Sequence, residues 1–168
     1  RSRGLGDVYK RQGAFRALGR VLSGTVAPGQ RVKVLGEAYT PEDEEDMALA
    51  EVEHVYVGET RYVVETDGVP AGSWALLAGV DASIVKSATL CDAALPAEQT
   101  HPLRPLTHLT ESVLKVAVEP LNPSELPRML EGLRKVNKTY PLLTTRVEES
   151  GEHTLIGTGA VSYTHLRA

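Results

Sequence analysis

The chain has 168 residues and a net charge of −4, with 42% apolar and 24% charged residues. This composition is ordinary for a folded domain in water, and the length allows one medium domain or two small ones. The longest apolar run is too short to cross a bilayer, and no secretory signal pattern is present. The single cysteine, Cys91, excludes an intramolecular disulfide and fits a reducing compartment.

The two ends of the sequence share no periodicity with their neighbours. Residues 1–12 read RSRGLGDVYKRQ and residues 161–168 read VSYTHLRA. Both resemble translated adapter or vector sequence. We therefore expect both segments to be non-native, and they are left out of the fold prediction.

Residues 13–92 predict a domain made of short β-strands. Apolar and polar residues alternate in several segments, and turn signals separate these segments. Ala27–Gln30 has proline and glycine at its two central positions, which is the pattern of a type II turn. Residues 50–57, AEVEHVYV, predict one continuous strand. Trp74 follows a turn and precedes an apolar strand, so it is expected in the core of the domain or at the rim of a barrel. The set predicts an antiparallel β-barrel of the translation-factor type, which closes on itself and leaves no free edge.

One stretch of this predicted barrel is strongly acidic. No lysine or arginine lies between Lys33 and Arg61, whereas nine acidic residues do. The run Pro41–Asp46 is expected to be a solvated loop, because closely spaced like charges repel and resist ordering. The alternative is a loop that docks a basic partner. The candidate contact residues for such a partner are Asp43, Glu44, Glu45 and Asp46.

Residues 93–105 are proline-rich and predict a connector, after which the pattern changes. Residues 106–160 predict a strand at 113–119, a helix, and two strands at 142–148 and 153–157. This order is the front half of a ferredoxin-like, split βαβ domain, so residues 106–160 predict a partial domain of that type.

The helix prediction depends on apolar residues at helical spacing, namely Leu126, Met129, Leu130, Leu133 and Val136. Ser124 is the preferred N-cap, because it places Pro127 in the first turn, where a missing N–H costs nothing. Capping at Asn122 is the alternative and places Pro123 at the first helical position. Arg128, Arg134 and Lys135 fall largely off the apolar stripe and are candidate contacts to RNA or to an acidic protein.

Nucleotide-binding and metal-binding motifs are absent from the sequence. A G-x-x-x-x-G-K-[ST] phosphate-binding loop does not occur. NKTY at Asn137–Tyr140 lacks the aspartate with which an N-K-x-D box reads guanine. Cys91, His101 and His108 lack the spacing of a zinc site. We therefore expect no cofactor-binding or metal-binding residue in this chain.

A catalytic reading of the sequence ESGEH is also disfavoured. Ser150 and His153 are close in sequence, but nothing nearby supplies an oxyanion hole or an orienting acid. A tight hairpin turn with Gly151 at positive φ explains the pattern better. We therefore expect no catalytic residue here.

Three stretches resemble the translocase-type GTPases, the family of elongation factor 2. They are GRVLSGTVAPGQRVKVLGEAYTPEDEED, VPAGSWALLAGVDASIVKSATL and VAVEPLNPSELPRMLEGLRKVNKTYPLLTTRVEESGEHTLIGTG. In that family a G domain precedes a β-barrel second domain and a ferredoxin-like third domain. The resemblance covers Gly13 to Gly159 and implies a fragment with the second domain and part of the third. The family continues GTGEL where this chain has Gly159-Ala160-Val161, which implies a truncation.

Within the family, LGEAYTPEDEED, GSWALLAGVDASIVKSATLC and NPSELPRMLEGLRKVNKTYP look closer to the spliceosomal branch than to translational elongation factor 2. That resemblance implies a nuclear protein of the U5 small nuclear ribonucleoprotein, with a large scaffold protein, a helicase and small nuclear RNA as candidate partners and no membrane. GTP and Mg²⁺ would belong to a G domain outside this chain, which would also be an intramolecular partner. The chain itself would couple and interact rather than catalyse. The alternative is a cytoplasmic translocase acting on the ribosome.

Overall fold

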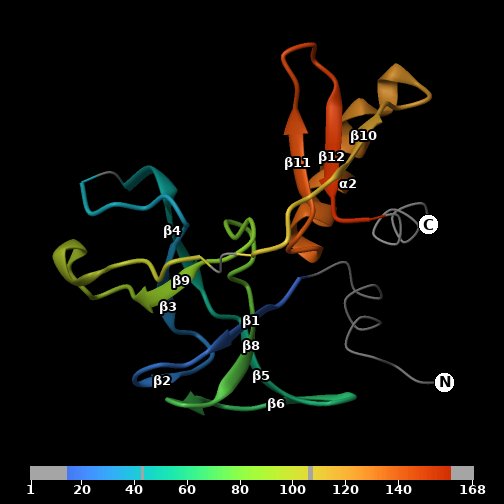
Figure 1. The fold of residues 1–168 in the computed structure, drawn as a ribbon. Helices are drawn as coiled ribbons and strands as arrows, with labels where there is room; N and C mark the ends of the chain where they lie inside the picture. Colours follow the sequence, from blue (N-terminus) through green and yellow to red (C-terminus); the bar gives the residue numbers. More distant parts are fainter. Residues whose placement is uncertain (1–14, 43, 106–107, 160–168) are drawn as a thin grey trace. The chain divides into compact units, whose positions relative to one another are not determined.

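The computed structural model describes residues 15–42, 44–105 and 108–159. The terminal segments expected to be non-native lie outside these ranges. The chain divides into two units, Arg1–Arg104 and Pro105–Ala168. Figure 1 colours the first from blue to yellow and the second from yellow to red.

The first unit consists of short antiparallel strands. They are β1 (Ala17–Arg20), β2 (Thr25–Val26), β3 (Arg31–Leu35), β4 (Met47–Glu51), β5 (His54–Glu59), β6 (Tyr62–Glu65), β7 (Val69–Pro70), β8 (Trp74–Ala78) and β9 (Thr89–Asp92). They form a four-stranded sheet in the order β1-β8-β5-β6, a three-stranded sheet in the order β4-β3-β9, and the pair β2-β7. The expected mostly-β, barrel-like fold is confirmed. The expected closure is not, because the sheets of the described residues do not join into a ring and β1 lies at an edge.

The core of the first unit follows from strand alternation. Val32 and Val34 of β3 point inward together with Val55 of β5 and Ala75 and Leu77 of β8. Successive side chains of a strand alternate between faces, so every second residue enters the core. Full burial of such an aliphatic side chain stabilises the fold by about 1.5–3 kcal/mol.

The continuous strand predicted for residues 50–57 was wrong. β4 ends at Glu51 and β5 begins at His54, and both Val52 and Val55 are fully buried. Two buried residues three positions apart cannot share the face of a regular strand. Between the strands, Val52 donates its N–H to Gln30 O at 3.0 Å, so the chain changes sheets at this point.

The type II turn predicted for Ala27–Gln30 is confirmed. Gly29 has a φ of 79°, and the N–H of Gln30 donates to Ala27 O at 3.4 Å, as a type II turn requires. Gly72 has a φ of 91° in the turn that precedes β8.

A connector was expected at residues 93–105, but residues 93–104 belong to the first unit and pack against the rest of it. Thr100 is fully buried, and its hydroxyl lies 3.2 Å from the Tyr39 hydroxyl. Lys33 Nζ donates to Leu95 O at 2.6 Å. A short 3₁₀ helix, η2 (Ala97–Gln99), precedes Thr100.

The second unit has the strand–helix–strand–strand order predicted from the sequence. Its elements are β10 (Leu114–Val118), the 3₁₀ helix η3 (Pro123–Glu125), α2 (Leu126–Thr139), β11 (Thr144–Val147) and β12 (His153–Gly157). The strands form an antiparallel sheet in the order β10-β12-β11. In Figure 1, α2 lies beside this sheet.

The predicted N-cap, Ser124, was wrong. Ser124 lies inside η3, and α2 begins at Leu126 after Glu125. The 3₁₀ turn explains the difference, because its i→i+3 bonding lets the N–H of Leu126 reach Pro123 O. Pro123 thereby begins the 3₁₀ turn, and Pro127 still falls in the first turn of α2, where its missing N–H breaks no bond.

Candidate partner-contact surfaces

The acidic run Pro41–Asp46 ends in an ordered turn. Asp46 closes the 3₁₀ helix η1 (Glu44–Asp46), and its carboxylate Oδ2 accepts the N–H of Ala38 at 2.9 Å. Its backbone carbonyl accepts the N–H of Gly36 at 2.8 Å. A Cβ at position 36 would overlap the Asp46 carboxylate, so glycine is required for this approach.

This turn corrects the expectation that the run 41–46 resists ordering throughout. A carboxylate that accepts a backbone N–H gains a charge-assisted hydrogen bond, which offsets repulsion from its acidic neighbours. Asp43 and the side chain of Glu44 lie outside the described residues, and Glu45 is exposed. Of the four candidate contacts, Asp46 therefore also has a structural role within the unit.

A second polar group lies next to the acidic stretch. Ser87 Oγ donates to Glu37 Oε1 at 2.7 Å. Burial lowers the pKa of Lys86, and the negative charge of Glu37 partly counteracts that shift. A side-chain hydrogen bond therefore connects Glu37, in the acidic stretch, to the segment that precedes β9.

The three basic residues of α2 that are candidate contacts are exposed but do not share one face. Arg128 and Lys135 are seven positions apart, which is about two helical turns, so they project in nearly the same direction. Arg134 projects about 100° from Lys135. Arg128 and Lys135 could therefore contact the same partner surface, whereas Arg134 lies on another side of the helix.

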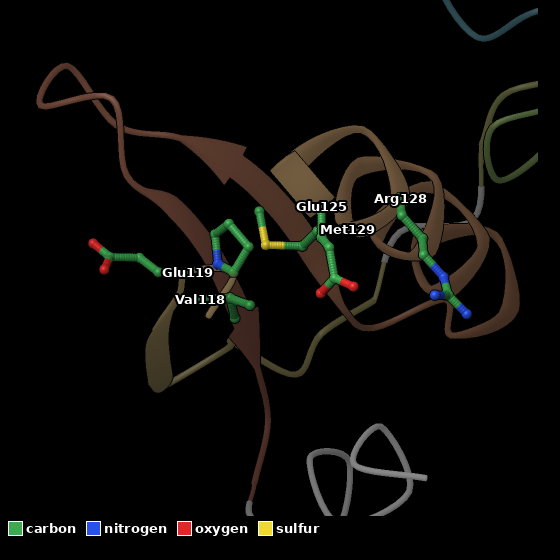
Figure 2. Close-up of a pocket in the computed structure, with 6 residues that line it drawn as sticks. Val118, Glu119, Glu125, Arg128 and Met129 are labelled. Atoms are coloured by element: carbon green, nitrogen blue, oxygen red, sulfur yellow. The ribbon is translucent and has the colours of Figure 1, made fainter. Parts of the chain in front are cut away.

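A pocket of about 270 Å³, open to solvent, lies where β10 meets the start of α2. It is lined by Val118, Glu119, Pro120, Glu125, Arg128 and Met129. In Figure 2, Met129 extends from α2 toward Val118, whereas the guanidinium of Arg128 extends away from them. The pocket has apolar walls with one basic and two acidic residues at its border.

One polar cluster in the second unit was missed by the sequence analysis. Lys115 Nζ lies 2.8 Å from Glu148 Oε1, and Thr154 Oγ1 donates to the same oxygen at 3.1 Å. The hydrogen bonds from Lys115 and Thr154 hold the pKa of Glu148 below its usual range. These residues are distant in sequence, and only the pairing of β10 and β11 with β12 brings them together.

The hairpin-turn interpretation of ESGEH is confirmed. β11 pairs with β12, Gly151 has a φ of 88°, and its N–H donates to Glu148 O at 2.9 Å. Ser150 and His153 are therefore neighbours because the chain turns there.

Residues typical of metal sites are dispersed in the structure. Burial raises the pKa of the Cys91 thiol, which keeps it protonated, and His101 and His108 are exposed. Across residues 15–42, 44–105 and 108–159, no group of three or more His, Cys, Asp or Glu side chains could hold a metal ion. No helix in the same ranges is long and apolar enough to cross a membrane.

Sequence comparisons place this fold among known proteins. Residues 15–91 match the family described as elongation factor Tu domain 2. The chain is 55% identical over 145 residues to the 109 kDa U5 small nuclear ribonucleoprotein component GFL of Arabidopsis thaliana. It is 55% identical to the 110 kDa component CLO of the same plant and 56% identical to the pre-mRNA-splicing factor cwf10 of Schizosaccharomyces pombe, again over 145 residues.

Each of these matches covers 86% of this chain and 15% of the relative. The chain therefore corresponds to a small part of a much longer type of protein. The match within residues 15–91 and the high identity agree with the antiparallel fold of the first unit. The first unit therefore matches the elongation factor Tu domain 2 family over residues 15–91, and the chain as a whole is similar to a part of the U5 components GFL and CLO and of cwf10.

Proposed function

We propose that this chain is the coupling part of a spliceosomal, elongation-factor-2-like GTPase that acts in pre-mRNA splicing within the U5 small nuclear ribonucleoprotein. The observation that carries the proposal is the identity of 55–56% over 145 residues to relatives named for that particle and for splicing. Identity at this level supports the splicing role over the translational alternative.

The chemistry of the described residues supports a role in interaction rather than catalysis. In the full-length protein, GTP and Mg²⁺ would be held by a G domain outside this chain. The two units would transmit the state of that domain to partners in the nucleus, including a large scaffold protein, a helicase and small nuclear RNA. The exposed charges on η1 and α2 are the groups best suited to such contacts.

A segment exchange tests the proposal. The matching segment of fission-yeast cwf10 is replaced by residues 15–159 of this chain, and intron removal is measured in cells that depend on the chimera. A second chimera carries the corresponding segment of translational elongation factor 2. We expect splicing with the first chimera and loss of splicing with the second. If the first chimera accumulates to the normal level but does not support splicing, the proposal is wrong.

The acidic contact surface is tested in the same chimera. Replacing Glu44 and Glu45 by glutamine removes two charges while retaining the hydrogen bonds of Asp46. If the loop docks a basic partner, recovery of U5 proteins with the chimera should fall, and the difference should shrink at high salt. Glu98→Gln, at another exposed site, is the matched control. Equal recovery at every salt concentration would exclude this role.

Charge reversals test the basic residues of α2 against each other. Reversing the charges of Arg128 and Lys135 together should weaken a contact that uses their shared direction. Reversing Arg134 alone should have a smaller effect, because it projects elsewhere. If Arg134 has the larger effect, the contact lies on a different side of the helix.

A further inference from the structure

The edge strand β1 combines an unpaired backbone edge with an unusual exposed surface. It is the outer strand of the sheet β1-β8-β5-β6, and its pairing partner is β8 (Figure 1). Val21, directly after β1, donates its N–H to Ser73 O at 3.0 Å. Because backbone groups of a strand alternate in direction, those of Leu18 and Arg20 point away from β8. Within the described part of the chain, neither residue has a recorded partner on that side.

The side chains on the outer face of this edge form a row. Leu18 lies opposite Leu76, and Arg20 lies opposite Trp74, so all four share one face. Leu76 is only 3% exposed and forms the base of the surface. Leu18 and Trp74 remain 64% and 59% exposed, so the sheet presents a leucine and an indole to solvent. Leu18, Arg20, Trp74 and Leu76 are called the β1 edge surface below.

The charge on this surface is basic. Arg20 is exposed, and no ion pair is recorded for it within the described residues. The guanidinium of Arg16 stacks over the Tyr56 ring at 4.3 Å, on the face that also carries Leu76. Among the described residues of this sheet, Glu65 carries a carboxylate on the same face, and that carboxylate lies 2.6 Å from His54 Nδ1. Along the strand, the pattern of the outer face is therefore Arg16–Leu18–Arg20.

We propose that an extended segment of a partner protein pairs with the free edge of β1. The segment carries an apolar side chain flanked, two residues away, by a carboxylate. Its backbone would bond to the outward groups of Leu18 and Arg20, as in β-strand addition. Its apolar side chain packs on Leu18 and Trp74, and its carboxylate pairs with Arg20, because residues directly opposite on paired strands share a face. Tryptophan and arginine together are the residue types that most often dominate the affinity of protein interfaces.

A nucleic acid fits this surface less well. Nine acidic residues lie between Lys33 and Arg61 in the same unit, and they repel phosphate groups. A phosphate group can accept hydrogen bonds from the outward N–H groups of an edge strand but cannot donate to its C=O groups, whereas a polypeptide pairs with both. The proposal concerns the edge of β1 itself and does not depend on the role in splicing.

Trp74 is the only tryptophan of the chain, so its fluorescence reports on this surface. The probe is a short blocked peptide with Glu-Thr-Leu-Thr-Glu at its centre, a pattern that fits β1 in either strand direction. The 168-residue chain is titrated with this peptide and with two variants of it. One has lysine in place of glutamate, and the other is N-methylated on the residues whose N–H would face β1. We expect saturable binding of the first peptide and at least about tenfold weaker binding of both variants.

Substitutions in the chain provide the complementary test. Leu18→Pro removes an outward N–H without removing a bond to β8, and edge strands tolerate proline. Leu18→Pro and Arg20→Glu should each weaken binding at least about tenfold. Leu49→Ser and Arg61→Glu change an exposed leucine and an exposed arginine elsewhere in the unit, and they should leave binding unchanged. Circular dichroism confirms that each variant is folded.

Three results would overturn the proposal. The first is the absence of saturable binding, or equal binding of the N-methylated peptide. The second is self-association of the chain that Arg20→Glu abolishes, because the occupant would then be a second copy. The third is a fluorescence change with single-stranded RNA but not with the peptide.

Discussion

The two units of this chain bury very different amounts of apolar side chain. The first unit has a contiguous core in which Val32, Val34, Val55 and Leu77 contribute from three strands. In the described part of the second unit, Leu143 and Leu155 are the buried apolar residues. On β10, Leu114 and Val116 remain 37% and 38% exposed, although they share a face with Val118. The comparison shows that correct topology does not by itself supply a core.

The largest effect that tests this comparison is cooperativity of unfolding. We expect residues 106–160 alone to lack a cooperative thermal transition, because a three-stranded sheet with one helix buries too little apolar area. Residues 15–104 alone should melt cooperatively. Calorimetry on both segments measures the difference. A sharp transition for residues 106–160 would contradict the expected contrast.

Core truncation in the first unit should have the next largest effect. Leu35 is fully buried at the end of β3, so Leu35→Ala should lower the free energy of unfolding by about 2–5 kcal/mol. Leu49 on the neighbouring β4 is 69% exposed. Leu49→Ala should therefore change the free energy of unfolding by less than about 0.5 kcal/mol. Urea unfolding followed by Trp74 fluorescence measures both. Similar losses in the two variants would contradict the difference in burial between Leu35 and Leu49.

Glycine substitutions should act with opposite signs in the two units. Gly36→Ala should destabilise the first unit by about 1–3 kcal/mol, because its new methyl group overlaps the Asp46 carboxylate. Gly132 lies inside α2 with open space at its Cβ position, so Gly132→Ala should stabilise that helix by about 0.5–1 kcal/mol. Thermal melting of the full chain measures both effects. If the two substitutions shifted the melting temperature in the same direction, the described surroundings of either Gly36 or Gly132 would be contradicted.

The smallest expected effect is a pH dependence in the second unit. The folded-state pKa of Glu148 is depressed, so its contribution to stability is present above the ordinary glutamate value of 4.5 and is lost as pH falls through the folded pKa. Lys115→Met should move the pKa of Glu148 back toward 4.5. Carboxylate chemical shifts measured by NMR report this pKa. An unchanged titration in Lys115→Met would show that Lys115 is not the main cause.

Local sequence signals predicted much of this structure. Turn chemistry predicted the positive φ of Gly29 and Gly151, and apolar periodicity predicted α2. These features are determined by residues a few positions away along the chain, so they can be inferred from one sequence. The resemblance to the elongation-factor-2 family then provided the order of the two units.

Features that depend on distant contacts were not predictable from local patterns. The break at Val52 arises where the chain passes between two sheets, so alternation alone could not locate it. The role of Asp46 depends on a backbone N–H eight residues earlier. The exposure of Trp74 depends on its place beside the edge strand, whereas its flanking residues suggested the core or the rim.

The contact between Gly36 and Asp46 has a consequence for the divergence of related sequences. A side chain at position 36 would occupy the space of the Asp46 carboxylate, which would then have to leave its hydrogen bond with the Ala38 N–H. Lineages that lose the acid release the constraint on the glycine, whereas lineages that keep the hydrogen bond of this acid with the Ala38 N–H should also keep the glycine. The two positions should therefore change together over evolutionary time, although ten positions separate them in the chain.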